Sequence, residues 1–221
     1  MNKILLAHIK HVGNYKNFTE ELEVFRNSLN LRKGEKFPVM LEGEFIKICH
    51  DEIKSYADSA KLLSKILKGT SVIYYGSFDD DVISIDLYLN GELITLTLIS
   101  NGVYDYEEVL PELDRELFKK YLPIEGIDEL LDIIKLTESL TNAPRDDNYG
   151  EEEARLIYRT MDKMIDEFGR VLSVNLMEIP LDYVLIHGFQ GYTNPRFQNY
   201  FIYDDIDNLV FFKRRWNKFE T

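Results

Sequence analysis

The chain has 221 residues, of which 45% are hydrophobic, and its net charge at neutral pH is −13. Its single cysteine, Cys49, excludes an intramolecular disulfide and is typical of a reducing compartment. A membrane span is excluded because no run of about 18 apolar residues occurs, and the short apolar run at the N-terminus does not resemble a secretory signal. We therefore expect a soluble, cytoplasmic protein that is large enough to build a sizeable core.

The first third of the chain predicts strands and amphipathic helices in alternation. Apolar residues at helical spacing indicate the helices, and period-two alternation indicates the strands. Pro38 and Gly43 predict a loop over residues 37–43. The expected elements are a strand over residues 1–8, a helix over 17–30, a short strand over 44–48 and a helix over 51–68.

Asn90-Gly91 predicts a tight hairpin turn, because both central residues of a type I′ turn need a positive φ. Counting outward from this turn places Asp86 opposite Thr95 on a polar face, with apolar pairs on the other face. One apolar and one polar face are typical of a half-buried antiparallel pair. Together with a preceding strand from residue 71, the hairpin forms an antiparallel meander over about 71–99.

The remainder of the chain predicts three more helices and a few short strands. The helices are expected over residues 111–121, 127–140 and 151–168, the last ending at Gly169. Strands are expected over 181–189, 200–203 and 209–212. The fold class is therefore α+β, an antiparallel meander packed against several amphipathic helices. We expect residues 1–221 to form one domain, with a candidate subdomain boundary in the loop at 141–150.

Gly76-Ser77 followed by Asp86 resembles the motif of nucleotidyltransferases of the polymerase-β type. In that family, Gly-Ser lies beside the phosphates, and an Asp-x-Asp pair on a following strand holds Mg²⁺. The resemblance implies a nucleotide and metal site at Gly76, Ser77 and Asp86. The sequence departs from the motif where Ser84 or Tyr88 replaces the second carboxylate, and Mg²⁺ on a lone carboxylate is a weak site. We prefer a structural role for Asp86 as the cross-strand partner of a threonine.

Other residues that commonly bind metals do not form a recognisable motif. The aspartates at 79–81 and 204–207 lack the later ligand positions of an EF-hand loop. The four histidines and the lone cysteine form no zinc pattern, and His8 and His187 lie in apolar runs typical of core residues. We expect no metal and no cofactor.

The negative charge is concentrated in the middle of the chain. Residues 76–153 hold 21 acidic and 5 basic residues. Such a block repels phosphate groups, which makes nucleic acid and anionic membranes poor partners, and it favours encounter with a basic protein. A solubilising surface is the alternative explanation.

These features predict a non-enzymatic, acidic interaction protein that binds or inhibits a basic, toxin-like protein. The size, the charge and the lack of a complete catalytic motif are typical of bacterial immunity proteins that neutralise toxin nucleases. The alternative is an enzyme with a dispersed site, at best a degenerate Mg²⁺-dependent nucleotidyltransferase-like protein. The residues at which we expect the partner to bind are Asp79, Asp80, Asp81, Asp105, Glu107 and Glu108.

Overall fold

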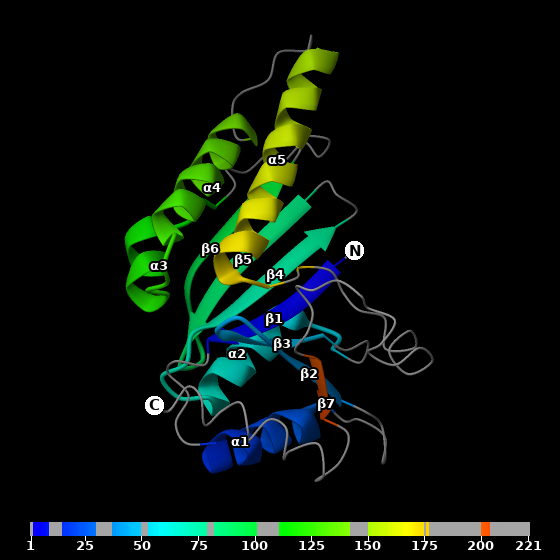
Figure 1. The fold of residues 1–221 in the computed structure, drawn as a ribbon, viewed down its shortest axis with the longest axis vertical. Helices are drawn as coiled ribbons and strands as arrows, with labels where there is room; N and C mark the ends of the chain where they lie inside the picture. The colour runs from blue at the N-terminus through cyan, green and yellow to red at the C-terminus, as the bar shows by residue number, and fades with distance from the viewer. Residues whose placement is uncertain are drawn as a thin grey trace.

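The computed structural model describes residues 2–8, 15–29, 37–49, 53–78, 82–100, 111–141, 150–174, 176 and 200–203. Within these ranges the strands form one seven-stranded antiparallel sheet in the order β6-β5-β4-β1-β3-β2-β7 (Figure 1). The strands are β1 (Asn2–His8), β2 (Phe37–Glu42), β3 (Phe45–Ile48), β4 (Val72–Phe78), β5 (Val82–Leu89), β6 (Glu92–Ser100) and β7 (Tyr200–Tyr203). The helices are α1 (Tyr15–Ser28), α2 (Tyr56–Ile66), α3 (Arg115–Tyr121), α4 (Ile127–Thr141) and α5 (Glu151–Leu172). The predicted α+β class, with a meander at β4–β6, is confirmed.

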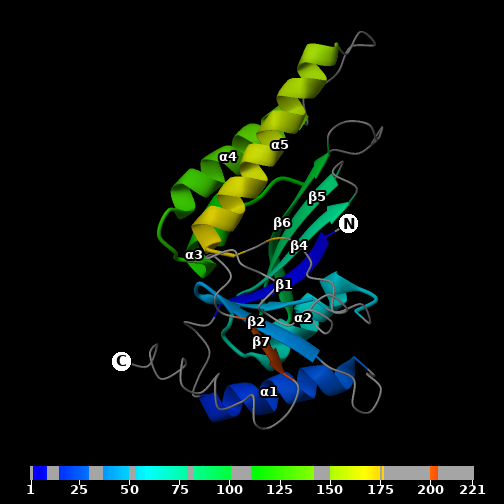
Figure 2. The ribbon, with the colours of Figure 1, turned by 45° about the vertical axis from the view of Figure 1, so that its right-hand side comes forward.

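Helices cover both faces of the sheet, so the molecule has three layers (Figure 2). α3, α4 and α5 pack on one face, and α1 and α2 pack on the other. Consecutive side chains of β1 enter the two cores alternately, with Ile4 and Leu6 in one and Leu5 and Ala7 in the other. A central strand buried on both faces accounts for this unbroken apolar run. Within the described ranges, none of the helices combines the length and the hydropathy that crossing a bilayer requires.

We expected the polar face of the hairpin to face solvent, and this prediction is wrong. Asp86 and Tyr88 of β5 point toward the layer of α1 and α2, where their exposed fractions are 7% and 5%. Ile83 and Ile85 point the other way, into the core beneath α3–α5. Both faces of β5 are therefore interior, because each has its own helical layer.

The hairpin turn itself is confirmed, but the predicted register holds only beside it. Asn90 and Gly91 have φ values of +53° and +85°. A bulge between Leu87 and Tyr88 then shifts the pairing, so that Asp86 lies opposite Leu96 and not opposite Thr95. Thr95 faces the other layer, where its hydroxyl accepts a 2.7 Å hydrogen bond from the N–H of Asp114 at the start of α3.

The tip of this hairpin is fixed to the end of α2. The side-chain oxygen of Asn90 accepts a 2.8 Å hydrogen bond from the N–H of Gly69, which follows α2. The N–H of Gly91 donates to the hydroxyl of Ser64 over 3.0 Å. These bonds join α2 to the β5–β6 turn and fix the position of the predicted meander.

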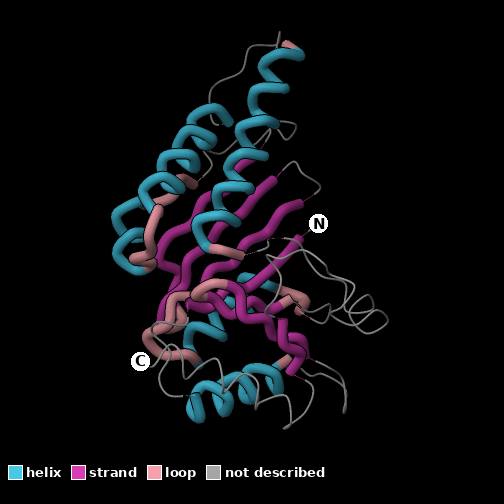
Figure 3. The backbone as a smooth tube through the Cα atoms, viewed as in Figure 1, coloured by secondary structure: helices cyan, strands magenta, loops and turns pink. Residues whose placement is uncertain are grey.

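Several predicted boundaries differ from the structure. Residues 37–42, which we expected to be a loop, form β2, which pairs with β3 and β7. α2 begins at Tyr56, because the hydroxyl of Ser55 accepts from the N–H of Asp58 and caps the helix there. α5 continues past Gly169 to Leu172 and ends at Ser173, whose φ is +55°. Figure 3 shows the helices in cyan and the strands in magenta.

The predicted strand over 200–203 is confirmed as β7 at the edge of the sheet. The strands expected over 181–189 and 209–212, and most of the boundary expected at 141–150, lie outside the described residues.

Candidate functional site

A cavity of about 510 Å³ lies where three segments meet: the β2–β3 turn, the α3–α4 connection and the C-terminal end of α5. Its volume falls within the range of small-ligand sites, about 300–1,000 Å³. The lining residues are Gly43, Glu44, Phe45, Ile124, Glu125, Gly126, Glu129, Arg170, Val171, Leu172 and Ser173.

Close packing of the β2–β3 turn on α5 forms one side of this cavity. Gly43 has a φ of +55°, and a Cβ built on it would lie 2.8 Å from the carbonyl oxygen of Leu172 and 2.9 Å from Cβ of Ser173. Only glycine combines that backbone angle with so close an approach. On the opposite side, Gly126, with a φ of +78°, turns the chain into α4, and its carbonyl oxygen accepts from the N–H of Leu130.

Charged side chains line the cavity, and acidic residues outnumber basic ones. Among the described lining residues, Glu44, Glu125 and Glu129 are acidic and Arg170 is basic. The Arg170 guanidinium donates to Glu129 over 2.7 Å and also to Glu167. Glu44 lies 3.3 Å from Nε2 of the buried His8. The side chains of Glu129 and Arg170 are 71% and 57% exposed, so both are free to rearrange around a ligand.

Apolar residues contribute only the smaller part of the cavity lining, which is mainly polar. Phe45 and Leu172 are buried in the core beneath α3–α5, and Ile124 and Val171 pack against that core while remaining half-buried. A mainly polar lining with more carboxylates than bases, and with some hydrocarbon surface, suits an organic cation such as a guanidinium or ammonium group on an aliphatic stem.

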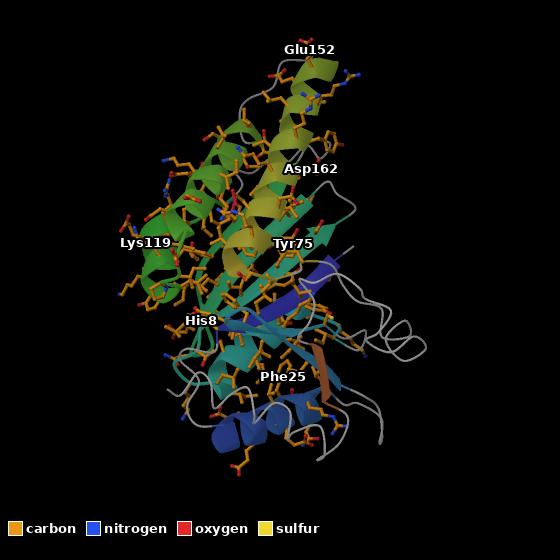
Figure 4. The ribbon with its side chains drawn as sticks, in the orientation of Figure 1. His8, Phe25, Tyr75, Lys119, Glu152 and Asp162 are labelled. Atoms are coloured by element: carbon orange, nitrogen blue, oxygen red, sulfur yellow. The ribbon has the colours of Figure 1, made fainter. Side chains whose placement is uncertain are left out.

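Next to the cavity, α3 and α4 carry an excess of exposed carboxylates, which we call the α3–α4 acidic surface. Some are neutralised by ion pairs, such as Lys119 with Asp128 at 2.7 Å and Arg115 with Asp132. The Lys119 side chain lies on the outer side of α3 (Figure 4). The surface comprises Glu112, Asp114, Glu116, Glu125, Asp128, Glu129 and Asp132. Among the described residues, Glu112, Glu116 and Glu125 have no ion-pair partner.

Asp86, the aspartate singled out in the sequence, is the centre of a buried hydrogen-bonded cluster on the α2 side of the sheet. Its carboxylate accepts from the hydroxyls of Ser84 at 2.7 Å and Tyr88 at 3.1 Å. Burial raises the pKa of Asp86 above 3.8, and these two hydrogen bonds partly offset the effect. Burial, reinforced by the charge of Asp86, raises the pKa of Tyr74 to about 12 and also raises that of Tyr88. Both oxygens of the Asp86 carboxylate thus accept a hydrogen bond, one from Ser84 and the other from Tyr88.

The structure does not bring Ser77 and Asp86 to the same face of the sheet. Gly76 and Ser77 lie within β4, where Ser77 pairs with Ile83, whose side chain enters the core beneath α3–α5. Asp86 pairs with Tyr74, whose side chain enters the other core. β4 continues beyond Ser77 to Phe78, so no helix begins there as the nucleotidyltransferase motif would require.

Glu138 of α4 is a buried acid that the sequence reasoning did not single out. Its exposed fraction is 4%, and its carboxylate accepts a 2.8 Å hydrogen bond from the N–H of Leu113, just before α3. Burial raises its pKa above 4.5, partly offset by the Thr97 hydroxyl and by the Leu113 N–H. The geometry gives Glu138 a structural role in holding the start of α3 against α4.

The six acidic residues that we predicted to bind the partner, Asp79, Asp80, Asp81, Asp105, Glu107 and Glu108, lie outside the described residues. The aspartates at 204–207 and His187 lie outside them as well. Within the described ranges, no three His, Cys, Asp or Glu side chains gather closely enough to hold a metal ion.

The cavity could not be predicted from the sequence, because its lining residues come from three distant segments of the chain. The only local signal is a glycine beside a glutamate at two of them, Gly43-Glu44 and Glu125-Gly126. Comparisons of the chain with protein-family models, curated proteins and solved structures gave no match.

Proposed function

We propose that this chain is a non-catalytic binding protein of the inhibitor or immunity type, and that its α3–α4 acidic surface docks a basic protein. The observation that carries the proposal is the set of exposed carboxylates on that surface that have no ion-pair partner among the described residues, Glu112, Glu116 and Glu125. Helix folding does not require this excess, since α3 is capped by Asp114, which accepts from the N–H of Leu117.

The charge of the wider acidic block agrees with this proposal. Within the described part of residues 76–153, 13 acidic residues accompany 4 basic ones. Two of these acids, Asp86 and Glu138, are buried, so most of the excess lies on helix surfaces and at loop ends. A field of one sign mainly accelerates encounter with an oppositely charged protein and excludes wrong partners. The predicted contribution of Asp79 and its five acidic companions stays part of the proposal.

The test is a charge reversal that leaves the cavity unchanged. Full-length protein and the double variant Glu112→Lys/Glu116→Lys are used as bait at about 0.15 M ionic strength, where the Debye length is about 8 Å. Captured basic proteins are identified, purified and remixed with each bait to measure the affinity of the pair. We expect the double variant to lose most of that affinity.

The matched control is Glu20→Lys/Asp162→Lys, which changes the net charge equally at exposed acids of α1 and α5. The side chain of Asp162 lies on α5 in Figure 4. An equal loss of affinity in both double variants would show that net charge alone matters. Full binding by Glu112→Lys/Glu116→Lys would show that the partner docks elsewhere. Either result would overturn the proposal.

A further inference from the structure

We infer that the cavity between the β2–β3 turn, the α3–α4 connection and α5 receives a basic side chain, arginine or lysine, of the partner protein. Naming the cation as a partner's side chain rests on the proposed function. The cavity itself, and its preference for a cation, rest on the lining residues alone.

The volume and position of the cavity fit a single side chain. About 510 Å³ is enough for an extended arginine and too small for a folded element. Glu125 and Glu129 belong both to the cavity lining and to the α3–α4 acidic surface. A basic protein docked on that surface therefore lies beside the cavity opening.

The charge of the lining comes from its side chains and not from its helix ends. The C-terminal end of α5 and the N-terminal end of α4 both reach the cavity, and their dipoles have opposite signs there. Three glutamates against one arginine leave the lining negative. Glu125 has no ion-pair partner among the described residues, so it is available to an incoming cation.

The protein already shows how a guanidinium binds here. Arg170 reaches from the last turn of α5 to Glu129 at 2.7 Å and to Glu167 on its own helix. Carboxylates placed to accept from one planar guanidinium suit a second one that approaches from outside. Arg170 therefore competes with the ligand, and its removal should strengthen binding of an external cation.

Two side chains of the lining can contact the stem of the ligand. Ile124 and Val171 are half-buried and provide hydrocarbon surface in a lining that is otherwise mainly polar. Arginine and lysine bury such stems while their charged heads stay near water and carboxylates.

The experiment titrates the full-length, isotope-labelled protein with n-butylguanidinium and, as a neutral mimic of the same shape, n-butylurea. Binding is followed by the amide NMR shifts of Gly43, Gly126 and Ser173. We expect n-butylguanidinium to shift these signals saturably and n-butylurea to leave them unchanged. Equal shifts with both compounds, or shifts spread over all exposed acids, would overturn the inference.

Variants sharpen the same titration. Glu129→Gln should weaken n-butylguanidinium binding about two- to fivefold, and Arg170→Ala should strengthen it by a similar factor, as exposed ion pairs allow. The controls are Asp162→Asn and Arg159→Ala, exposed residues of α5 outside the cavity lining, which should leave binding unchanged. No change in Glu129→Gln, or weaker binding in Arg170→Ala, would contradict the assignment.

This titration needs no partner protein, so the two proposals fail separately. A cavity that binds the probe, combined with partner affinity that is insensitive to Glu112→Lys/Glu116→Lys, would overturn the proposed function and leave the cation site standing. If the cavity does not bind n-butylguanidinium while partner affinity falls in Glu112→Lys/Glu116→Lys, only the inference about the cavity is overturned.

Discussion

Replacing Gly43 by alanine tests the contact on which the cavity depends. A methyl group at this position would lie 2.8 Å from the carbonyl oxygen of Leu172 and 2.9 Å from Cβ of Ser173, on a backbone with φ of +55°. The left-handed backbone costs alanine about 1–2 kcal/mol, and overpacking adds about 1–3 kcal/mol. We therefore expect Gly43→Ala to lower the free energy of unfolding by about 2–5 kcal/mol.

Gly69→Ala is the matched control for this prediction. Gly69 also has a positive φ, +79°, but no atom beyond its chain neighbours lies within 4 Å of its Cβ position. Alanine there should incur only the backbone cost, about 1–2 kcal/mol. In urea denaturation with an m-value of about 3 kcal/mol/M, the midpoint of Gly43→Ala should fall below that of Gly69→Ala by about 0.3–1 M. Equal midpoints would refute the packing of the β2–β3 turn against the end of α5.

Two buried carboxylates give further predictions. Because burial raises the pKa of Asp86 above 3.8, the folded protein holds this proton more tightly than the unfolded chain, and wild-type stability falls as the pH rises through the raised pKa. Asp86→Asn removes that dependence on pH. The free energy of unfolding of this variant, measured in urea, should therefore rise relative to that of the wild type between about pH 4 and pH 7. A difference between the two proteins that stays constant over this range would contradict the prediction. Glu138→Leu leaves the N–H of Leu113 without its acceptor and should cost about 1–3 kcal/mol. Glu138→Gln keeps an acceptor, so equal losses in the two variants would show that this hydrogen bond does not stabilise the fold.

Local turn chemistry could be predicted from the sequence, whereas the register beyond the turn could not. Asn90-Gly91 forms the expected turn because two adjacent positive φ values leave few other choices. The bulge between Leu87 and Tyr88 depends on contacts that no local pattern contains. One of them is the bond from the N–H of Asp114, before α3, to the hydroxyl of Thr95.

Burial on both sheet faces was the larger difference between prediction and structure. The alternation over residues 44–48 predicted the strand β3, in which Lys47 is fully buried, with an exposed fraction of 0%. A lysine or an aspartate in an alternating strand is typical of the solvent side. That expectation fails here because helices cover both faces of the sheet: Lys47 pairs with Leu6 on the face beneath α3–α5, whereas Asp86 lies on the face beneath α1 and α2.

The fold class followed from hydrophobic periodicity, but the cavity could not follow from it. Periodicity reports which side chains face a core, so it located the helices over 127–140 and 151–168 nearly as they occur. A cavity forms where elements fail to meet, and its lining here combines residues 43–45, 124–129 and 170–173. Their proximity is a property of sheet order and helix docking, which the sequence does not encode locally.

The acidic residues fall into two groups, and the division separates folding from binding. Carboxylates of the first group each accept a specific hydrogen bond within the fold, as Asp86, Asp114 and Glu138 do. Substitution of these residues should cost stability, so any loss of binding in such variants would be ambiguous. Glu112 and Glu125 make no such bond among the described residues, and an isolated surface charge of this kind changes stability by no more than about 0.5 kcal/mol. A binding defect at these positions, with unchanged unfolding, would therefore report the partner surface directly.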